Sequence, residues 1–379
     1  MLLLTRVFPC LICLFITVYS LLKLSGEKIL RKTFNPIILF YLLYIIINTF
    51  SATLHNDSFI LNWTLWKNFE ILTACLWSIW LYYVFLMYGH KQIFHNLLKL
   101  VNYFFVILGV FSIYSFLQEN SLTNLILYIR PSLEVPIINP IMLSLIAVFI
   151  LVYSVLNLKK TRYQLLYFIF ILLGITLLLI AKSRTGYFIA IFYSVFYTYY
   201  FNNFSAKIKT YILFFVTIVL ASIYSQYLEF SRLGDAFSDG FGGRISKSET
   251  KFENTSWGES LIFIEQNLFF GQGNLNYQRF INSKNYSVDN SILQFLLASG
   301  IIGGTLIISY LFFILPAKIH KFFKKHKFNP SSKLVLLLIL IAYFRSMTTN
   351  GFSTYGFELL FLLLSYSFIK YMNDAKKII

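Results

Sequence analysis

Long apolar stretches, separated by short polar connections, recur along nearly the whole chain. A helix of about 20 apolar residues crosses the hydrocarbon core of a bilayer, and its internal hydrogen bonds satisfy its backbone there. The pattern therefore predicts an all-α polytopic membrane protein with about eleven transmembrane helices. These are expected near residues 7–22, 34–50, 70–88, 97–117, 137–158, 163–181, 186–202, 208–228, 291–316, 334–349 and 355–372.

One polar segment, residues 229–290, is too long to be a simple connection. Its first half is rich in Gly, whereas its second half has apolar residues four, three and four positions apart, at Trp257, Leu261, Ile264 and Leu268. This spacing predicts an amphipathic helix lying on the membrane surface and ended by Gly271 and Gly273. The chain then divides into helices 1–8 (1–228), the large loop (229–290), and helices 9–11 with the C-terminus (291–379).

Composition supports a membrane protein, and the charge distribution indicates which side of the membrane each connection faces. Of the 379 residues, 58% are hydrophobic and only 12% are charged, which is outside ordinary globular usage. Lys and Arg concentrate in alternate connections and at the C-terminus, so that side is cytoplasmic and the 229–290 loop is extracytoplasmic. This bias accounts for the net charge of +17, and a nucleic-acid partner is not expected. Cys10, Cys13 and Cys75 all fall in apolar spans, so the loop has no disulfide framework.

A basic pair, Lys182 and Arg184, lies in the short extracytoplasmic turn between the sixth and seventh spans. Arg presents a planar fork of donors to phosphate, while Ser183 and Thr185 add hydroxyl groups and the next helix adds free N–H groups. One interpretation is a binding site for an anion. The other is anchoring of the helix ends to lipid headgroups.

The large loop holds further candidate substrate-binding cations, Arg232, Arg244 and Arg279, although basic residues that alternate with acidic ones are also typical of a solvated surface. Arg244 follows two glycines, which would allow the backbone to approach a ligand closely. At the end of the loop, Asp289 and Asn290 directly precede a span. Either residue is a good helix N-cap, and Asp289 is also a candidate general base.

Arg345 lies inside the tenth span, near its outer end, where a charge needs a partner. Glu358 is the nearest candidate, and both a structural ion pair and a contact with substrate are open. The sequence contains no phosphate-binding loop, dinucleotide glycine pattern or acidic cluster on the outer side, so no metal and no cofactor are expected.

These features occur in a recognisable order: the Ser183-Arg184-Thr185-Gly186 turn, the late loop with its Trp257 helix, Gly271 and Gly273, then Asp289-Asn290 and the Gly-rich residues 299–304. The chain resembles the O-antigen polymerase and O-antigen ligase superfamily, best over residues 180–360. The resemblance implies a metal-independent glycosyltransferase in the bacterial inner membrane, acting at its extracytoplasmic face on a glycan carried by undecaprenyl pyrophosphate. Membrane lipids and a chain-length regulator are further expected partners.

The resemblance also implies roles for individual residues. Arg184 and Arg244 are expected to hold the pyrophosphate, with Asp289 as the hypothetical base. Lys182, Ser183, Arg232, Trp257, Arg279, Asn290 and Arg345 are expected to contact substrate. Ligases of the family typically have His-Asn where this chain has Asp289-Asn290, which favours a polymerase of O-antigen, capsule or exopolysaccharide repeat units. The alternatives are a ligase and a transporter of the lipid-linked glycan. Transport is expected to need charges deep inside several spans. Beyond the first and last three residues of each predicted span, the only charges are Arg345 and Glu358, and both are near the outer edge.

Overall fold

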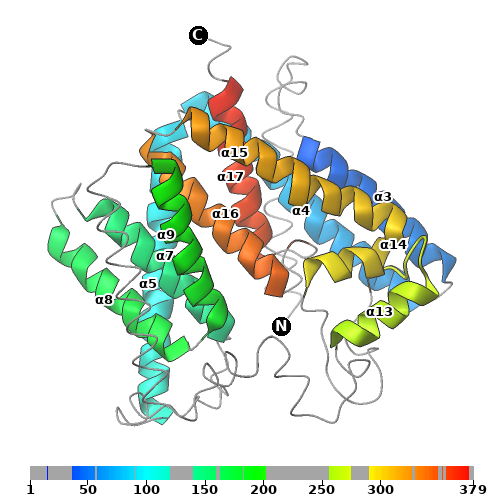
Figure 1. Cartoon of the computed structure of the whole chain (residues 1–379), viewed down its shortest axis with the longest axis horizontal. Helices are drawn as coiled ribbons and strands as arrows, with labels where there is room; N and C mark the ends of the chain where they lie inside the picture. The colour runs from blue at the N-terminus through cyan, green and yellow to red at the C-terminus, as the bar shows by residue number, and fades with distance from the viewer. Residues whose placement is uncertain are drawn as a thin grey trace. The chain divides into compact units, whose positions relative to one another are not determined.

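The computed structural model describes Phe15 and residues 36–55, 58–88, 90–119, 140–158, 163–181, 183–201, 256–274, 290–326, 329–348, 352 and 356–374. These residues are helical apart from short turns (Figure 1). The chain forms two compact units. Unit 1 takes residues 1–93, 250–326 and 345–379, and unit 2 takes residues 94–249 and 327–344.

Unit 1 is built mainly from helices that are distant in sequence. They are α3 (Pro36–Leu54), α4 (Ser58–Tyr88), α13 (Ser256–Gln266), α14 (Ser291–Ser309), the π-helical turn η5 (Tyr310–Ile314), α15 (Leu315–Lys325) and α17 (Phe357–Asp374). Helices α3 and α4 form an antiparallel hairpin, in which the Asn48 amide donates to Oδ1 of Asn68 at 2.9 Å. Helix α14 and the turn η5 pack along α3, where Phe40 of α3 stacks on Tyr310 of η5 with ring centroids 4.3 Å apart.

Helices α4 and α17 run in the same direction. Ser78 and Ser367 are hydrogen-bonded at 2.8 Å, and further toward the C-terminal end of both helices Tyr82 donates to Asp374 at 2.8 Å. Both helices were predicted as odd-numbered spans, and two such spans must cross a membrane in the same direction. Their N-terminal ends therefore lie at one end of unit 1.

Unit 2 consists of α5 (His90–Glu119), α7 (Pro140–Asn157), α8 (Gln164–Ala181), α9 (Arg184–Phe201) and most of α16 (Pro330–Thr348). Its core is aromatic: Phe105 meets Phe149 edge to face at 5.2 Å. Lys333 donates to the Tyr197 hydroxyl at 3.0 Å and lies 5.0 Å from the centre of that ring, which holds α16 against α9.

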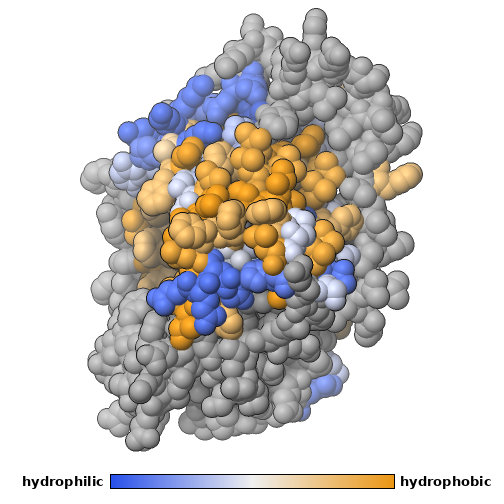
Figure 2. Space-filling view, turned by 90° about the vertical axis from the view of Figure 1, so that its right-hand side faces the viewer, coloured by the Kyte–Doolittle hydropathy of each residue, from blue (hydrophilic) through white to orange (hydrophobic). Residues whose placement is uncertain are grey.

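Six of the described helical segments are long and apolar enough to cross a membrane: Pro36–Leu54, Ile60–Met87, Gln92–Gln118, Gln164–Ala181, Ser291–Lys325 and Pro330–Met347. Figure 2 shows a hydrophobic belt on one face of the molecule, with hydrophilic residues along its borders. Such a belt is what a bilayer requires of the surface that contacts its hydrocarbon core. The described part of the chain is thus all-helical, and its apolar helices indicate a multi-pass membrane protein.

Most of the predicted helices are found, with two notable differences. Helix α4 begins at Ser58 rather than near residue 70, and the helix that begins at Ser291 continues to Lys325 rather than ending near residue 316. Helices α7, α9 and α17 form where spans were predicted, but they are not among the six long apolar segments. The predicted span 7–22 apart from Phe15, the predicted span 208–228, and most of the 229–290 loop lie outside the described residues.

Candidate functional site

Helix α13 forms where the apolar spacing predicted a helix in the large loop. It packs against the first half of α14 through a small cluster of Ile264 and Leu297, with Phe263 at its edge. The chain then turns at Gly271 and Gly273, whose φ angles of 74° and 80° are in the region that favours glycine. Helix α13 ends at Gln266, and the turn residues 267–270, which include Leu268, separate it from these glycines, so they follow the helix rather than end it as predicted.

Helix α14 is interrupted at Gly300, whose φ of 61° and ψ of −165° are not helical. In a continuous helix, the N–H groups of residues 301 and 302 would donate to the carbonyl groups of residues 297 and 298. Here the Leu297 carbonyl accepts from Gln272 N at 2.9 Å, and the Ala298 carbonyl accepts from Gly273 N at 3.0 Å. On the other side of the break, Ile301 N donates to Leu268 O at 2.8 Å and Ile302 N donates to Phe269 O at 3.3 Å.

We call this arrangement, residues 268–273 paired with residues 297–302, the junction. A backbone group left without a partner inside a membrane costs several kcal/mol, in the range of ~2–7 for a buried amide. The junction prevents this cost by providing a partner for each of the four groups that the break releases. Close packing also depends on glycine, because a Cβ at Gly300 would lie 2.3 Å from the Phe269 carbonyl oxygen.

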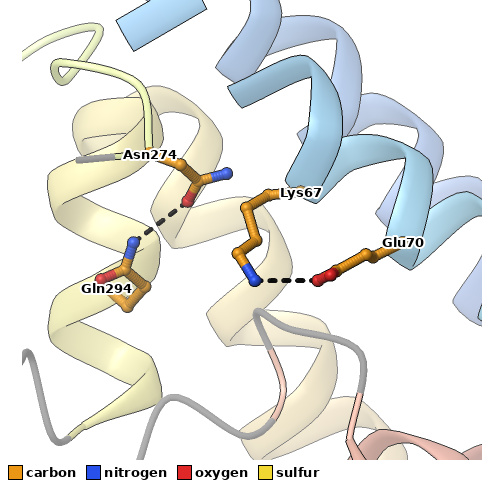
Figure 3. Close-up of polar contacts among 4 residues, drawn as sticks. All are labelled: Lys67, Glu70, Asn274 and Gln294. Carbon is orange, nitrogen blue, oxygen red and sulfur yellow. Dashed lines mark hydrogen bonds and ion pairs between the residues drawn. The ribbon is translucent and has the colours of Figure 1, made fainter. Parts of the chain in front are cut away.

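The junction brings Asn274 against α4, where a cluster of polar side chains is buried. We call Thr64, Lys67, Glu70, Asn274 and Gln294 the polar cluster (Figure 3). Asn274 N donates to the Thr64 hydroxyl at 2.9 Å, and the Gln294 amide donates to Asn274 Oδ1 at 3.0 Å. The cluster therefore joins three segments: α4, the chain after α13, and the start of α14.

A buried ion pair lies beside these bonds. Lys67 Nζ is 2.9 Å from a carboxylate oxygen of Glu70, and the two side chains are 9% and 2% exposed. Lys67 is seven residues into the apolar segment that starts at Ile60, or about 10 Å along the helix axis. The predicted span 70–88 began at Glu70 and left Lys67 in the preceding loop, and this was wrong because α4 begins at Ser58. Their spacing of three residues from one another and from Thr64 was the available signal that all three share a helix face.

The start of α14 is held by side chains at the same end of unit 1. Asn290 is the N-cap: its Oδ1 accepts from Ile292 N at 2.8 Å and from Leu293 N at 3.3 Å, and its amide donates to Met347 O at 3.3 Å. The next residue, Ser291, accepts from Phe352 N at 3.1 Å. Of the two predicted caps, the structure thus assigns this role to Asn290.

Arg345 and Glu358 form an ion pair, as one of the two interpretations expected. Arg345 Nε is 2.8 Å from Glu358 Oε1, and the side chains are 12% and 10% exposed. Because the pair connects the end of α16 to the first turn of α17, it lies at the same end of unit 1 as the α14 cap. The ion pair joins two helices at this end of unit 1 and adds no net charge there.

In unit 2, the predicted basic turn precedes α9. Ser183 is buried, and its carbonyl accepts from Gly186 N at 3.1 Å. A Cβ at Gly186 would lie 2.7 Å from the Cβ of Ser144, so this glycine allows α9 to pack closely on α7. Arg184 is the first residue of α9, where free N–H groups favour an anion, but its side chain is outside the described part.

The remaining predicted site residues, or their side chains, lie outside the described part of the chain. Lys182, Arg232, Arg244, Arg279 and Asp289 lie outside the described residues. Trp257 is in the first turn of α13, with its side chain outside them. Of the expected residues, the structure brings Asn290 and Arg345 to one end of unit 1.

Comparison of the chain with protein-family models, with curated proteins and with solved structures found no match.

Proposed function

We propose that the chain is a membrane-embedded glycosyltransferase that polymerises the repeat units of a bacterial surface polysaccharide. Its donor would be the growing glycan on undecaprenyl pyrophosphate, and its acceptor a second lipid-linked repeat unit at the extracytoplasmic face of the inner membrane. One observation carries the proposal. The late residues on which the resemblance to O-antigen polymerases and ligases rests, Gly271, Gly273 and Asn290 with the Gly-rich residues 299–304, converge on the junction and on the cap of α14.

This convergence supports the proposal because those residues share one structural role, the formation of the junction and the cap of α14. The motif residues are about thirty positions apart, yet they determine how the end of the loop pairs with an apolar helix. A lipid-linked substrate would be bound where an extracytoplasmic loop meets the lipid, since its pyrophosphate stays among the headgroups while its sugars extend into water.

In the proposed reaction, a hydroxyl oxygen of the acceptor sugar attacks the anomeric carbon of the donor glycan. The new glycosidic bond forms as the bond from that carbon to the pyrophosphate oxygen breaks, and undecaprenyl pyrophosphate leaves. Asp289 takes the hydroxyl proton, and the guanidinium groups of Arg184 and Arg244 stabilise the charge on the leaving group. Each cycle adds one repeat unit.

The test is incubation of the purified chain, in detergent with EDTA, with lipid-linked repeat units extracted from cells that carry the protein. A ladder of longer glycans is expected from the parent protein and from Lys284→Ala, a loop cation to which the resemblance gives no role. Arg184→Ala and Arg244→Ala should produce no ladder while retaining the parent's thermal unfolding. A full ladder from Asp289→Asn would remove that residue as the base, and no ladder from folded parent protein would refute polymerisation.

Transport of the lipid-linked glycan is the second candidate, and two observations favour it. The Lys67 and Glu70 pair adds charges inside an apolar segment, and α14 is a discontinuous helix, a feature that transporters use to build binding sites. Sealed vesicles that contain the protein separate the two functions, because a transporter moves the glycan to the other leaflet without lengthening it. A ligase would instead transfer the glycan to an added lipid A core acceptor.

A further inference from the structure

The polar cluster in unit 1 has a composition that packing alone does not require. A charge inside an apolar helix is costly, and natural membrane proteins place one there mainly for function. Lys67 and Glu70 are both buried, and their charges cancel, so the cluster is polar without a net charge. The ring of Trp63, half-buried on the same helix, is centred 5.2 Å from Lys67 Nζ.

Asn274 is the second, independent observation. Its side chain is 2% exposed, and its Oδ1 accepts from Gln294, but its Nδ2 has no hydrogen-bond partner in the structure. Figure 3 shows the Nδ2 end of Asn274 turned toward Lys67. A buried donor without an acceptor costs free energy, so an amide held in this orientation suits a ligand that brings an acceptor.

The groups that converge here fit a neutral sugar better than an anion. Lys67 is already neutralised by Glu70, whereas an anionic site would keep its cation available. A sugar hydroxyl both donates and accepts, so it can accept from Asn274 or Lys67 and donate to Glu70. An aromatic side chain beside a few polar groups is typical of small-molecule sites, and the flat apolar face of a sugar ring packs well on such a ring.

We infer that Lys67, Glu70 and Asn274 form a binding subsite for a neutral sugar of the glycan, with the ring of Trp63 at its edge. The inference rests on the proposed function for the identity of the substrate as a lipid-linked glycan. Within the subsite, Glu70 accepts from a sugar hydroxyl, while Lys67 and Asn274 donate to sugar oxygens. The junction holds Asn274 in place, so the broken helix serves this subsite.

The test separates sugar binding from a purely structural ion pair. Replacing a buried pair by apolar residues of similar volume is often neutral for stability, so Lys67→Met combined with Glu70→Leu should fold. The matched control is Ser78→Ala with Ser367→Ala, which removes a buried polar contact of the same helix further from the cluster. The probe is the free oligosaccharide released by mild acid from the extracted lipid-linked repeat units and labelled at its reducing end.

Binding is measured by fluorescence polarisation with the full chain in detergent, and folding by thermal unfolding and size-exclusion chromatography. The parent and the control are expected to bind the oligosaccharide equally. The double variant should keep its fold but bind about 10-fold to 100-fold more weakly, because hydrogen bonds to charged groups are lost. Asn274→Asp keeps the acceptor for Gln294 and removes the donor, and it should also weaken binding by at least about 10-fold.

If the folded double variant binds the oligosaccharide as tightly as the parent does, the proposed subsite is refuted. If the double variant does not fold, the same affinity in Asn274→Asp refutes it. Absence of binding by the parent would overturn it as well. These results are distinct from failure of the proposed function. Binding without a product ladder would refute polymerisation and leave the subsite in place, whereas a ladder that the folded variants do not reduce would refute only the subsite.

Discussion

Gly300→Ala tests whether the break in α14 is built into the fold. The φ of 61° and ψ of −165° at this position are accessible essentially to glycine alone, and a non-glycine residue there costs about 1–3 kcal/mol. The new Cβ would also lie 2.3 Å from the Phe269 carbonyl oxygen, a backbone atom whose displacement would disturb the junction. Overpacking of this kind adds about 1–3 kcal/mol, so the expected loss in the free energy of unfolding is about 2–6 kcal/mol.

The assay is reversible unfolding of the purified protein by titration with SDS in mixed micelles, followed by circular dichroism. Gly109→Ala is the matched control. Its Cβ would meet the end of the Leu177 side chain, which can move, and alanine is the better helix former by about 1 kcal/mol. Asn should not rescue position 300, because the left-handed helical region that it tolerates has a ψ near +47° rather than −165°. Equal stability of Gly300→Ala and the parent would refute the reasoning.

Three further predictions follow from unit 1 and from α9. Asn290→Ala removes the cap of α14 and should cost about 0.5–2 kcal/mol in the same titration, and an unchanged midpoint would exclude the capping role. Glu358→Gln should lower the free energy of unfolding by about 3–5 kcal/mol, because it leaves Arg345 without its counter-charge in a largely buried position. The double variant Arg345→Met with Glu358→Leu should recover most of that loss. A double variant less stable than Glu358→Gln would contradict this prediction. Gly186→Val should lower the thermal unfolding midpoint by forcing α9 away from α7, and a midpoint equal to the parent's would show that the space is adaptable.

The hydropathy pattern was sufficient to locate the helices but not to place every end. It placed the start of α4 near residue 70 because Lys67, Asn68 and Glu70 are polar, and a hydropathy pattern measures the cost of exposure to lipid. In the folded chain these side chains face protein instead: Asn68 bonds to Asn48, and Lys67 to Glu70. The partner of Asn68 comes from another helix and cannot be read from local composition, whereas Glu70 is only three residues from Lys67.

The candidate site was predictable where one segment determines it. The spacing around Leu261 and Ile264 predicted α13, and the residue types at 289 and 290 predicted a cap, because both depend on neighbours in sequence. The break at Gly300 was not predicted. The glycines of residues 299–304 suit either close helix packing or a bend, and the choice depends on residues 268–273, which supply the hydrogen bonds.

The junction also constrains how the chain can vary in evolution. Four backbone hydrogen bonds join the segments 268–273 and 297–302 in a fixed register, so an insertion or deletion within either would misalign some of these bonds. Lengthening of the chain between Asn274 and Asn290 leaves this register intact. Related chains should therefore keep the lengths of the two paired segments fixed, with their glycines inherited together, while the length of the stretch between them drifts.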